Sequence, residues 1–175
     1  IADMKLPGDE VIDQWASPEE LKRLVTVENS KGILWGLIVS PGCDITIRDS
    51  EIRAVGVHYL GTSRARISGL KNKTTYKDFK LETDWHKLRL LNSSVTAWNF
   101  YTGDSAELEI RDSVFGETIS FKNSVIKIYD SVCDGTGGYL GAKDDSTTIF
   151  SRGKIIGAVL THGKANLSIE DSRVE

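Results

Sequence analysis

The chain has 175 residues, of which 39% are hydrophobic and 27% charged, and its formal net charge is −3. These values exclude a wholly disordered chain, and the slightly acidic balance gives no basic surface for binding nucleic acid. The longest apolar run, residues 32–39, is too short to span a membrane, and two cysteines do not make a disulfide scaffold.

Residues 1–24 precede the regular part of the sequence and are interpreted as a leader or cap. Within them, Ser17-Pro18-Glu19-Glu20 fits two structures equally well. One is a short capped helix over about residues 18–23, with the serine as N-cap and the proline in the first turn. The other is a simple turn. The sequence starts at Ile1 and stops inside a repeat, so we expect a longer natural protein.

From residue 25 onward a short pattern recurs about every 20 residues. It reads apolar-x-apolar-x-[Asn/Asp]-Ser, and its third position is aliphatic in all eight copies. Two copies are degraded, at residues 65–70 and 147–152, and the first of these ends in Gly69-Leu70. The fifth position of the eight copies falls on Asn29, Asp49, Gly69, Asn92, Asp112, Asp130, Ser151 and Asp171.

A second apolar pattern, with a period of two, lies in the middle of each repeat and predicts a further strand. We expect its inward side chains to be those of Leu37, Val57, Phe79, Trp98, Ile119 and Tyr139. The residues that follow then form an outward row, which consists of Ile38, His58, Lys80, Asn99, Ser120, Leu140 and Val159.

A unit of about 20 residues with two or three strands cannot close a core alone, so the units must stack. The sequence therefore predicts an all-β parallel β-helix over residues 25–175, with about seven to eight rungs. We expect right-handed coiling, because parallel crossovers are almost always right-handed. The last rung leaves an open sheet edge, for which we expect self-association or a continuing chain.

The rung length and the Asn/Asp-Ser turns resemble the right-handed parallel β-helix superfamily of pectate-lyase-like proteins. Most members of that superfamily bind or act on polysaccharide, usually outside the cytoplasm. The resemblance implies a polysaccharide or glycan partner and an extracellular, periplasmic or cell-surface location. It covers about residues 25–175 and is architectural, so it assigns no catalytic residue.

The predicted outward row and the residues two positions further on bring polar side chains together on the middle rungs. A tyrosine there would stack on a sugar ring, while amide and charged groups would bond hydroxyls and carboxylates. His58, Lys80 and Lys122 are the candidate catalytic residues, as a base or as the positive charge that a lyase needs. The same composition also fits an ordinary solvated sheet face. The candidate ligand-binding residues in this patch are Glu82, Asn99 and Tyr101.

The longest rung, residues 65–87, contributes two further candidates for ligand binding. Loops on a rigid scaffold often carry function, so Trp85 and His86 would form one wall of a groove. The alternative is that Trp85 packs over the edge of a rung.

The fifth-position column offers a weak candidate metal site. Asp112 and Asp130 fall on neighbouring rungs, and stacked carboxylates are ligands that Ca²⁺ accepts. The same residues also suit a ladder of turns, because Asn and Asp tolerate left-handed backbone and bond to nearby amides. We favour the turn ladder and expect no metal or other cofactor.

The two cysteines test the rung order. Cys43 ends the first rung and Cys133 lies in the sixth, so five strand spacings separate them by roughly 24 Å. That distance is beyond the reach of a disulfide. We expect two free thiols, with Cys133 buried in the same column as Ile52, Val95 and Val174.

Two kinds of function follow from these observations. The first is a non-catalytic surface scaffold that binds carbohydrate or mediates adhesion. The second is a polysaccharide lyase, hydrolase or epimerase that acts on an acidic glycan along the outward sheet face. We favour the first.

Overall fold

The structure is a computed structural model that describes residues 11–13, 24–39, 44–82 and 87–175. These ranges contain strands and turns and no helix, so the protein is an all-β parallel solenoid of about six turns. Among the described residues, no helix is long and apolar enough to cross a membrane. The expected helix over residues 18–23 lies outside the described residues, and the handedness of the coil stays a prediction.

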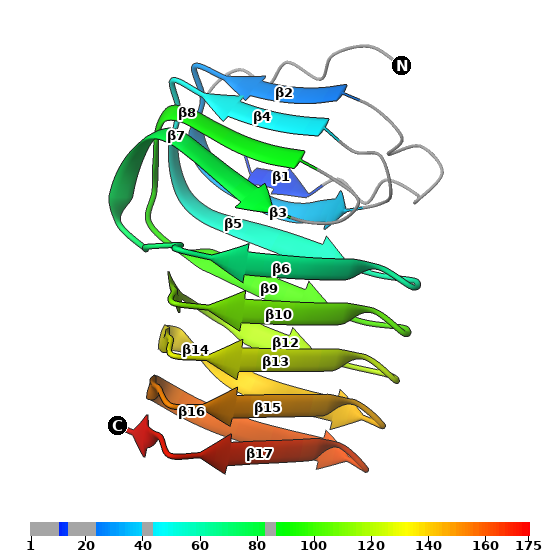
Figure 1. Ribbon diagram of the computed structural model, residues 1–175. Coiled ribbons are helices and arrows are strands. Elements are labelled where there is room, and N and C mark those ends of the chain that lie inside the picture. Colours follow the sequence, from blue (N-terminus) through cyan, green and yellow to red (C-terminus); the bar gives the residue numbers. More distant parts are fainter. Residues whose placement is uncertain (1–10, 14–23, 40–43, 83–86) are drawn as a thin grey trace.

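The mid-repeat strands form a parallel sheet at the back of the molecule in Figure 1, which we call the back sheet. Its strands pair in chain order, each with the one from the next turn. Short strands extend it at the N-terminal end, at the corner and in the last turn: β1 (Val11–Asp13), β11 (Val114–Phe115) and β18 (Arg173–Val174). The back sheet comprises β3 (Lys31–Val39), β5 (Glu51–Tyr59), β9 (Trp98–Thr102), β12 (Thr118–Ser120), β14 (Val132–Asp144) and β16 (Lys154–Gly163).

All eight copies of the repeated pattern form strands at the front of the molecule (Figure 1). They divide into two groups. The upper group pairs in the order β2 (Leu24–Glu28), β4 (Asp44–Arg48) and β8 (Lys87–Val95). The lower group is a separate five-stranded sheet in the order β6 (Arg64–Ser68), β10 (Glu107–Arg111), β13 (Val125–Tyr129), β15 (Thr147–Ser151) and β17 (Asn166–Glu170).

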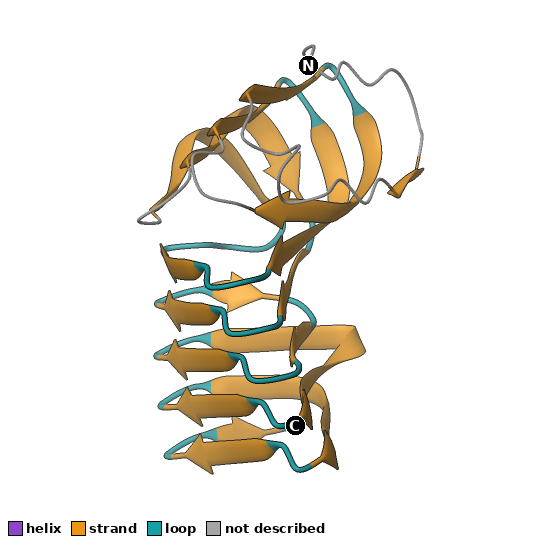
Figure 2. Ribbon diagram, turned by 90° about the vertical axis from the view of Figure 1, so that its right-hand side faces the viewer, coloured by secondary structure: helices purple, strands orange, loops and turns teal. Residues whose placement is uncertain are grey.

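The sequence predicts that the third copy of the repeat stacks between the second and the fourth. The structure shows that it does not. Strand β8 pairs with β4, while β6 pairs with β10 in the lower sheet. Between them, β7 (Thr74–Glu82) runs back antiparallel to β8. Figure 2 shows the result as an even stack of lower strands with the upper strands set at an angle to it. Because β7 does not enter the back sheet, that sheet contains six mid-repeat strands and the solenoid has about six turns.

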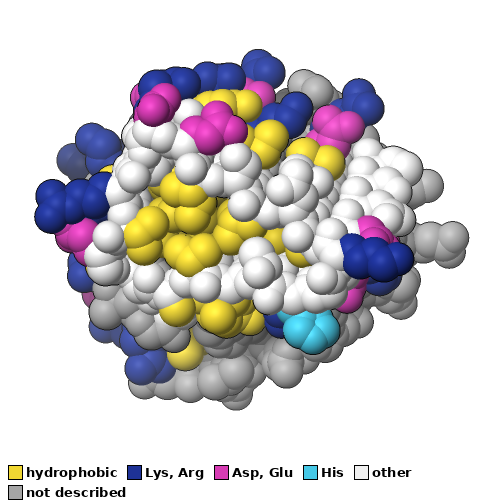
Figure 3. All heavy atoms as spheres, turned by 90° about the horizontal axis from the view of Figure 1, so that it is seen from below, with side chains coloured by type: hydrophobic (Ala, Val, Ile, Leu, Met, Phe, Trp, Pro, Cys, Tyr) yellow, Lys and Arg dark blue, Asp and Glu magenta, His cyan; other side chains and the backbone are white. Residues whose placement is uncertain are grey.

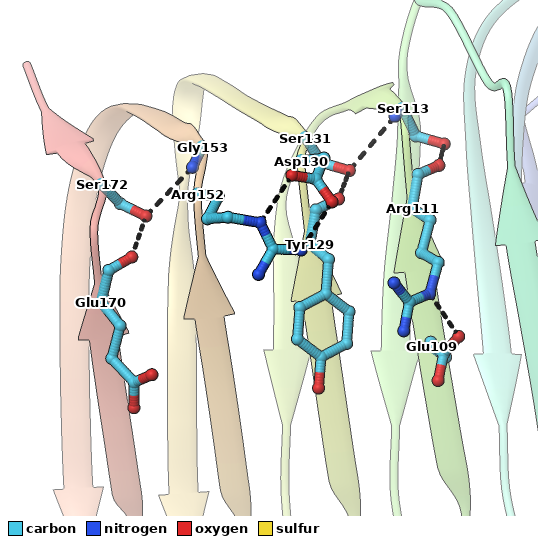
Figure 4. Close-up of polar contacts among 10 residues, drawn as sticks. All are labelled: Glu109, Arg111, Ser113, Tyr129, Asp130, Ser131, Arg152, Gly153, Glu170 and Ser172. Atoms are coloured by element: carbon cyan, nitrogen blue, oxygen red, sulfur yellow. Dashed lines mark hydrogen bonds and ion pairs between the residues drawn. The ribbon is translucent and has the colours of Figure 1, made fainter.

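The corner between each front strand and the back sheet has the same conformation in every turn. The residue at this corner is left-handed in all eight copies, with φ between 46° and 69°, and it is Asn, Asp or Gly in every copy except the seventh, where it is Arg152. In six copies a serine follows it and donates its hydroxyl to the carbonyl two residues earlier. In five of these copies the hydroxyl also accepts a backbone N–H from the neighbouring turn. Ser131, for example, donates to Tyr129 at 2.6 Å and accepts from Ser113 at 3.1 Å (Figure 4).

The serine ladder bridges the third copy. Leu70 occupies the serine position of that copy and offers no hydroxyl. The N–H of Ser50 instead donates to the hydroxyl of Ser93, 43 residues further along the chain, at 3.3 Å. Pairing of β4 with β6 would leave this buried N–H without its acceptor, which costs about 1–3 kcal/mol. The N–H of Leu70 itself donates to Ser113 in the lower sheet.

The core lies between the front and back strands and contains buried hydroxyls as well as apolar side chains. Thr118, Ser120 and Leu140 point inward, because they pair in register with buried residues of the neighbouring strands. The hydroxyl of Ser120 contacts those of Ser146 and Thr148 at 2.8 and 2.7 Å. Ser120, Leu140 and Val159 were expected to point outward, and this is wrong. The Ser120 hydroxyl is satisfied inside the core by other hydroxyls, while Leu140 and Val159 pair with each other and pack against the core.

One front strand is also shifted by a residue from the predicted alignment. Phe150, and not Ile149, pairs with Ile128 and is fully buried. Arg152 consequently takes the left-handed corner position, with a φ of 54°. Side chains alternate between the two faces of a strand, so this shift exchanges which of two apolar neighbours fills the core.

Cys133 is a free, buried cysteine that pairs with Phe115 on one side and Ile155 on the other. Burial raises the pKa of its thiol to about 12, so the sulfur stays protonated and unreactive. Val174 continues this column and Ile52 pairs with Val95, as the alignment predicted. Cys43 lies outside the described residues, so the expected separation of the two thiols stays a prediction.

The last turn exposes apolar side chains at the lower end of the solenoid. Leu160, Ile169 and Val174 are 49%, 36% and 50% exposed. Figure 3 shows hydrophobic side chains gathered in the middle of this end. Among the described strands, β17 and β18 each pair on one side only. Self-association or chain continuation at this edge stays a prediction.

Candidate functional site

The outward side chains of the back sheet form a straight row across five strands. The strands are parallel and in register, so residues that pair across neighbouring strands point to the same side. Neighbours in the row are separated by one strand spacing, about 4.8 Å. From β5 to β16 the row consists of His58, Tyr101, Ile119, Gly141 and Leu160.

An aromatic contact occupies the start of this row. The rings of His58 and Tyr101 stack with their centroids 4.6 Å apart and an interplanar angle of 25°. The Tyr101 hydroxyl donates a hydrogen bond to the carboxylate of Glu117 at 3.1 Å. Both rings are half-buried, so part of each is accessible from solvent. The contact exists because β9 follows β5 directly in the back sheet.

Two glycines let further rings lie against the sheet. A Cβ on Gly103 would stand 2.1 Å from the ring of Phe121, and a Cβ on Gly141 would stand 2.8 Å from the ring of Tyr139. Each ring therefore covers a glycine backbone instead of extending into solvent. The ammonium of Lys143 lies 5.8 Å from the centroid of the Tyr139 ring. We call the surface formed by His58, Tyr101, Ile119, Phe121 and Tyr139 the aromatic face.

Burial controls the protonation of the two stacked groups. Desolvation lowers the pKa of His58 from 6.5 to about 4, so its imidazole is neutral at neutral pH. Burial, with a further contribution from the Glu117 carboxylate, raises the pKa of Tyr101 above its ordinary value. The aromatic face therefore presents an uncharged imidazole and an uncharged phenol beside one carboxylate.

Asn99, predicted as a ligand-binding residue, lies beside the aromatic face but is 7% exposed. Its carbonyl oxygen accepts the N–H of Glu117 at 2.8 Å, and a Cβ on Gly116 would overlap the same oxygen. Asn99 thus fixes the connection from β9 to β12, and this places Glu117 within reach of Tyr101.

Lys122, predicted as a catalytic candidate, lies at the far corner of its turn and not in the row with His58. It has a left-handed φ of 56° and its ammonium forms an ion pair with Asp104. Hydrogen bonding to Lys122 is the main cause that lowers the pKa of the Asp104 carboxyl. The Asp104 carboxylate also accepts the N–H of Gly61 at 3.0 Å, so this corner pair links three turns.

We call the turns that carry the upper front strands the upper part of the solenoid and the turns that carry the lower front sheet the lower part. Two more of the predicted site residues lie in β7, which returns the chain from the lower part to the upper part. Lys80 and Glu82 lie in β7, at positions that pair with Arg89 and Lys87 of β8. They do not continue the row of His58, because β7 is not a back-sheet strand. Nothing further is described of these two side chains, and Trp85 and His86 lie outside the described residues.

Asp112 and Asp130, the weak candidate metal ligands, occupy neighbouring left-handed corners of the lower part. The Asp130 carboxylate bonds the guanidinium of Arg152 twice, at 2.8 and 2.7 Å (Figure 4). The ring of Tyr129 lies between Arg152 and Arg111, whose guanidinium carbons are 5.6 and 4.3 Å from its centroid. Across the described ranges, no three His, Cys, Asp or Glu side chains gather as metal ligands.

The sequence missed four residues of this surface: Glu117, Phe121, and also Ile119 and Tyr139, which were both expected inside the core. For Tyr139, the alternation in its repeat had been aligned one residue out of register. The available signal was the pair of glycines, Gly103 and Gly141. Each has a large ring as a neighbour on the same outward side, which a strand without those glycines would not accommodate.

Comparison of the chain with family models, with curated proteins and with solved structures gives no match. The functional inference therefore rests on the geometry of the described residues.

Proposed function

We propose that this protein is a non-catalytic polysaccharide-binding solenoid and that the aromatic face is its glycan-binding surface. The observation that carries the proposal is the stacked pair of His58 and Tyr101, continued along the solenoid axis by Ile119 and Tyr139. Accessible rings offer apolar faces against which the C–H groups of a pyranose pack.

The spacing of the aromatic face supports an extended ligand. Its side chains repeat with the strand separation of about 4.8 Å. A sugar residue advances a linear polysaccharide by a similar length, so successive sugars would meet successive turns. Polar groups border the row, with Glu117 on one side and Lys143 on the other. These groups suit the hydroxyls that a sugar presents at its ring edge.

The proposal includes membership of the pectate-lyase-like superfamily and a location outside the cytoplasm. Both are supported by the parallel solenoid and by the repeat of about 20 residues. Most members of that superfamily bind or act on polysaccharide, and the outward row of the back sheet crosses five strands, which gives a long ligand an extended surface.

The test is a binding assay of the full chain against a panel of soluble and insoluble polysaccharides, by pull-down and isothermal titration. Tyr101→Ala should weaken binding about ten-fold, which corresponds to roughly 1.4 kcal/mol. Tyr101→Phe keeps the ring and should retain most of the affinity. Thermal unfolding of each variant separates a loss of the surface from a loss of the fold.

Tyr129→Ala is the matched control, because that tyrosine lies on the lower front sheet with a guanidinium over each side of its ring. Its binding should stay within two-fold of the unmodified protein. Equal losses in the Tyr101 and Tyr129 variants, or no binding to any polysaccharide, would contradict the proposal.

A polysaccharide lyase or epimerase is the second candidate, and one observation favours it. His58 is neutral and lies against a tyrosine that is itself bonded to a carboxylate, so a base and a proton donor are adjacent. Release of unsaturated uronate or of reducing ends from acidic glycans, abolished by His58→Ala, would replace the binding function with this one.

A further inference from the structure

A concave surface lies at the corner of the upper part. It includes the start of β5, whereas His58 of the aromatic face lies near the end of that strand. It is a groove of about 450 Å³ that continues into a hollow of about 380 Å³ along the starts of β3 and β5. Lys31, Glu51 and Ser94 line both. We call the combined surface the corner groove.

The corner groove exists because β7 crosses beside three successive turns. Thr75 of β7 pairs directly with Ser94 of β8, so these two hydroxyl side chains share one side of the hairpin. The opposite wall is the left-handed corner column, represented by Asn29, Asp49 and Asn92. The groove therefore runs along the solenoid axis, between the corner column and the crossing strand.

The segment that leads into β7 is tied down by several hydrogen bonds. The Tyr76 hydroxyl donates to the carbonyl of Lys71 at 2.7 Å and accepts the N–H of the same residue. The N–H of Lys73 donates to Val95 at 2.9 Å, and the side-chain oxygen of Asn72 accepts the N–H of Trp98 at 3.2 Å. The wall of the groove is thus held in place before any ligand arrives, which lowers the entropic cost of binding.

The polar groups of the groove are balanced in charge. Lys31 and Glu51 form an ion pair at 3.1 Å across neighbouring turns. The amide of Asn92 donates to the carboxylate of Asp49 at 2.9 Å, and Arg53 adds a positive charge in the adjoining hollow. With two cations and two anions, the groove has no net attraction for a charged ligand.

Hydrogen-bonding groups remain for a ligand to use. Among the described contacts, the side-chain amide of Asn29 and the hydroxyls of Thr75 and Ser94 have no hydrogen-bond partner. None of the described lining residues is aromatic. The arrangement offers amide and hydroxyl groups in a preformed, electrically balanced groove without a stacking platform.

We propose that the corner groove is a separate carbohydrate site that takes an uncharged oligosaccharide through hydrogen bonds and not through ring stacking. The chemistry that selects the ligand is a set of paired donors and acceptors matching sugar hydroxyls. The lower part has no counterpart among its described corners, where Arg152 closes onto Asp130. The site therefore depends on the strand crossing and is independent of the aromatic face.

The test uses the full chain on an array of neutral gluco-, manno-, galacto- and xylo-oligosaccharides together with oligouronates. The unmodified protein should bind at least one neutral series. Thr75→Val removes one hydroxyl and should weaken that binding about three- to ten-fold. Asn92→Asp should weaken it ten-fold or more, because it replaces the donor to Asp49 with a second carboxylate. Aspartate is native at other left-handed corners, including Asp112 and Asp130, so this change is compatible with the fold.

Thr147→Val is the matched control, since it makes the same change on a front strand of the lower part and should leave binding unaltered. Tyr101→Ala should leave groove binding within two-fold. Neutral binding that is lost in Tyr101→Ala but unchanged in both groove variants would overturn the corner groove and leave the aromatic face standing. Binding of oligouronates alone, or of no glycan, would overturn the corner groove as well.

Discussion

The upper and lower parts of the solenoid are built from the same repeat but stack its copies in different orders. In the lower part Ser113 bonds to Ser131 of the copy that follows it in the chain, 18 residues away. In the upper part Ser50 passes over one copy and bonds to Ser93, 43 residues away. The passed-over copy keeps its aliphatic third position, Ile67, and lacks only the corner residues.

The corner hydrogen bonds follow the stacking order in the upper part, whereas in the lower part the seventh copy stacks in chain order with Arg152 and Gly153, and no hydroxyl, at its corner. An aliphatic side chain can fill any of several core positions, because hydrophobic packing has little directionality. A buried N–H requires an acceptor at one place. The crossing brings His58 beside Tyr101 and opens the corner groove along β7. The stacked pair of His58 and Tyr101 and the corner groove therefore both depend on the strand crossing.

The most decisive test of this comparison is a crosslink. Arg48 and Leu91 pair across β4 and β8, and paired residues of parallel strands lie within the Cα range of a disulfide. The double variant Arg48→Cys/Leu91→Cys should crosslink nearly completely under mild oxidation. Arg48→Cys/Ser68→Cys, the pair that regular stacking would bring together, should not. Peptide mass mapping without reduction measures which pair is crosslinked. Each single variant serves as a control for the native cysteines. A crosslink between positions 48 and 68, and none between 48 and 91, would refute the crossing.

The next largest effect concerns the register of the lower part. Phe150→Ala should lower the free energy of unfolding by about 3–5 kcal/mol, because it empties a fully buried position. Ile149→Ala, one residue earlier and only partly buried, should cost less than about 1 kcal/mol. Urea denaturation of both variants measures the difference. A larger loss for Ile149 would support the alignment predicted from sequence.

A smaller effect is expected at the serine ladder, and it should be alike in both parts. Ser93→Ala and Ser131→Ala each remove the acceptor of a backbone N–H, from Ser50 and Ser113 respectively. Each change should cost about 1–3 kcal/mol of stability. Ser68→Ala, at an exposed position of β6, serves as the control and should cost less than about 0.5 kcal/mol. If Ser93→Ala proved as mild as the control, the ladder would not govern the upper stacking.

The smallest effect is a pH dependence at the junction of the two parts. His58 has a pKa of about 4 in the folded chain and about 6.5 when unfolded, so the unfolded state binds more protons between these values. Stability should therefore fall as the pH is lowered from about 6.5 to 4, by about 1–2 kcal/mol once the partial exposure of the imidazole is considered.

His58→Gln should flatten this part of the stability profile, measured as the urea midpoint across the pH range. His162→Gln, at an exposed position of β16, should leave the slope in place. A slope that persists in the His58 variant would show that the junction does not hold this imidazole in its neutral form.

Much of the fold was accessible from sequence because its corners follow a simple rule. The Asn/Asp-Ser pairs mark positions that need left-handed backbone and a hydroxyl acceptor in six copies. The aliphatic third position extended the pattern to eight copies, and each of them forms a strand. The crossing was not predicted, because two copies lack both corner residues, Gly69-Leu70 and Ser151-Arg152, and only the first of them is passed over. Choosing between stacking orders requires knowing which buried N–H would lose its acceptor, and a spacing pattern does not contain that information.

The candidate sites were less accessible for a related reason. Outward and inward residues were assigned by aligning the period-two pattern of each repeat, but Ser120 is buried among other hydroxyls while Tyr139 lies outside over a glycine. His58 and Tyr101 were placed on the correct side, yet Lys80 was expected between them. Only the pairing of β5 with β9 makes the two rings neighbours.

The strand crossing also sets an order of events in folding. Strands β4 and β8 meet only after a loop of 43 residues closes, whereas neighbouring turns of the lower part close loops of about half that length. Each doubling of a loop costs about 0.6 kcal/mol of closure entropy. We therefore expect folding to nucleate among β10, β13 and β15 and to spread upward, with β8 docking late. The aromatic contact and the corner groove would then be completed only in the last steps of folding.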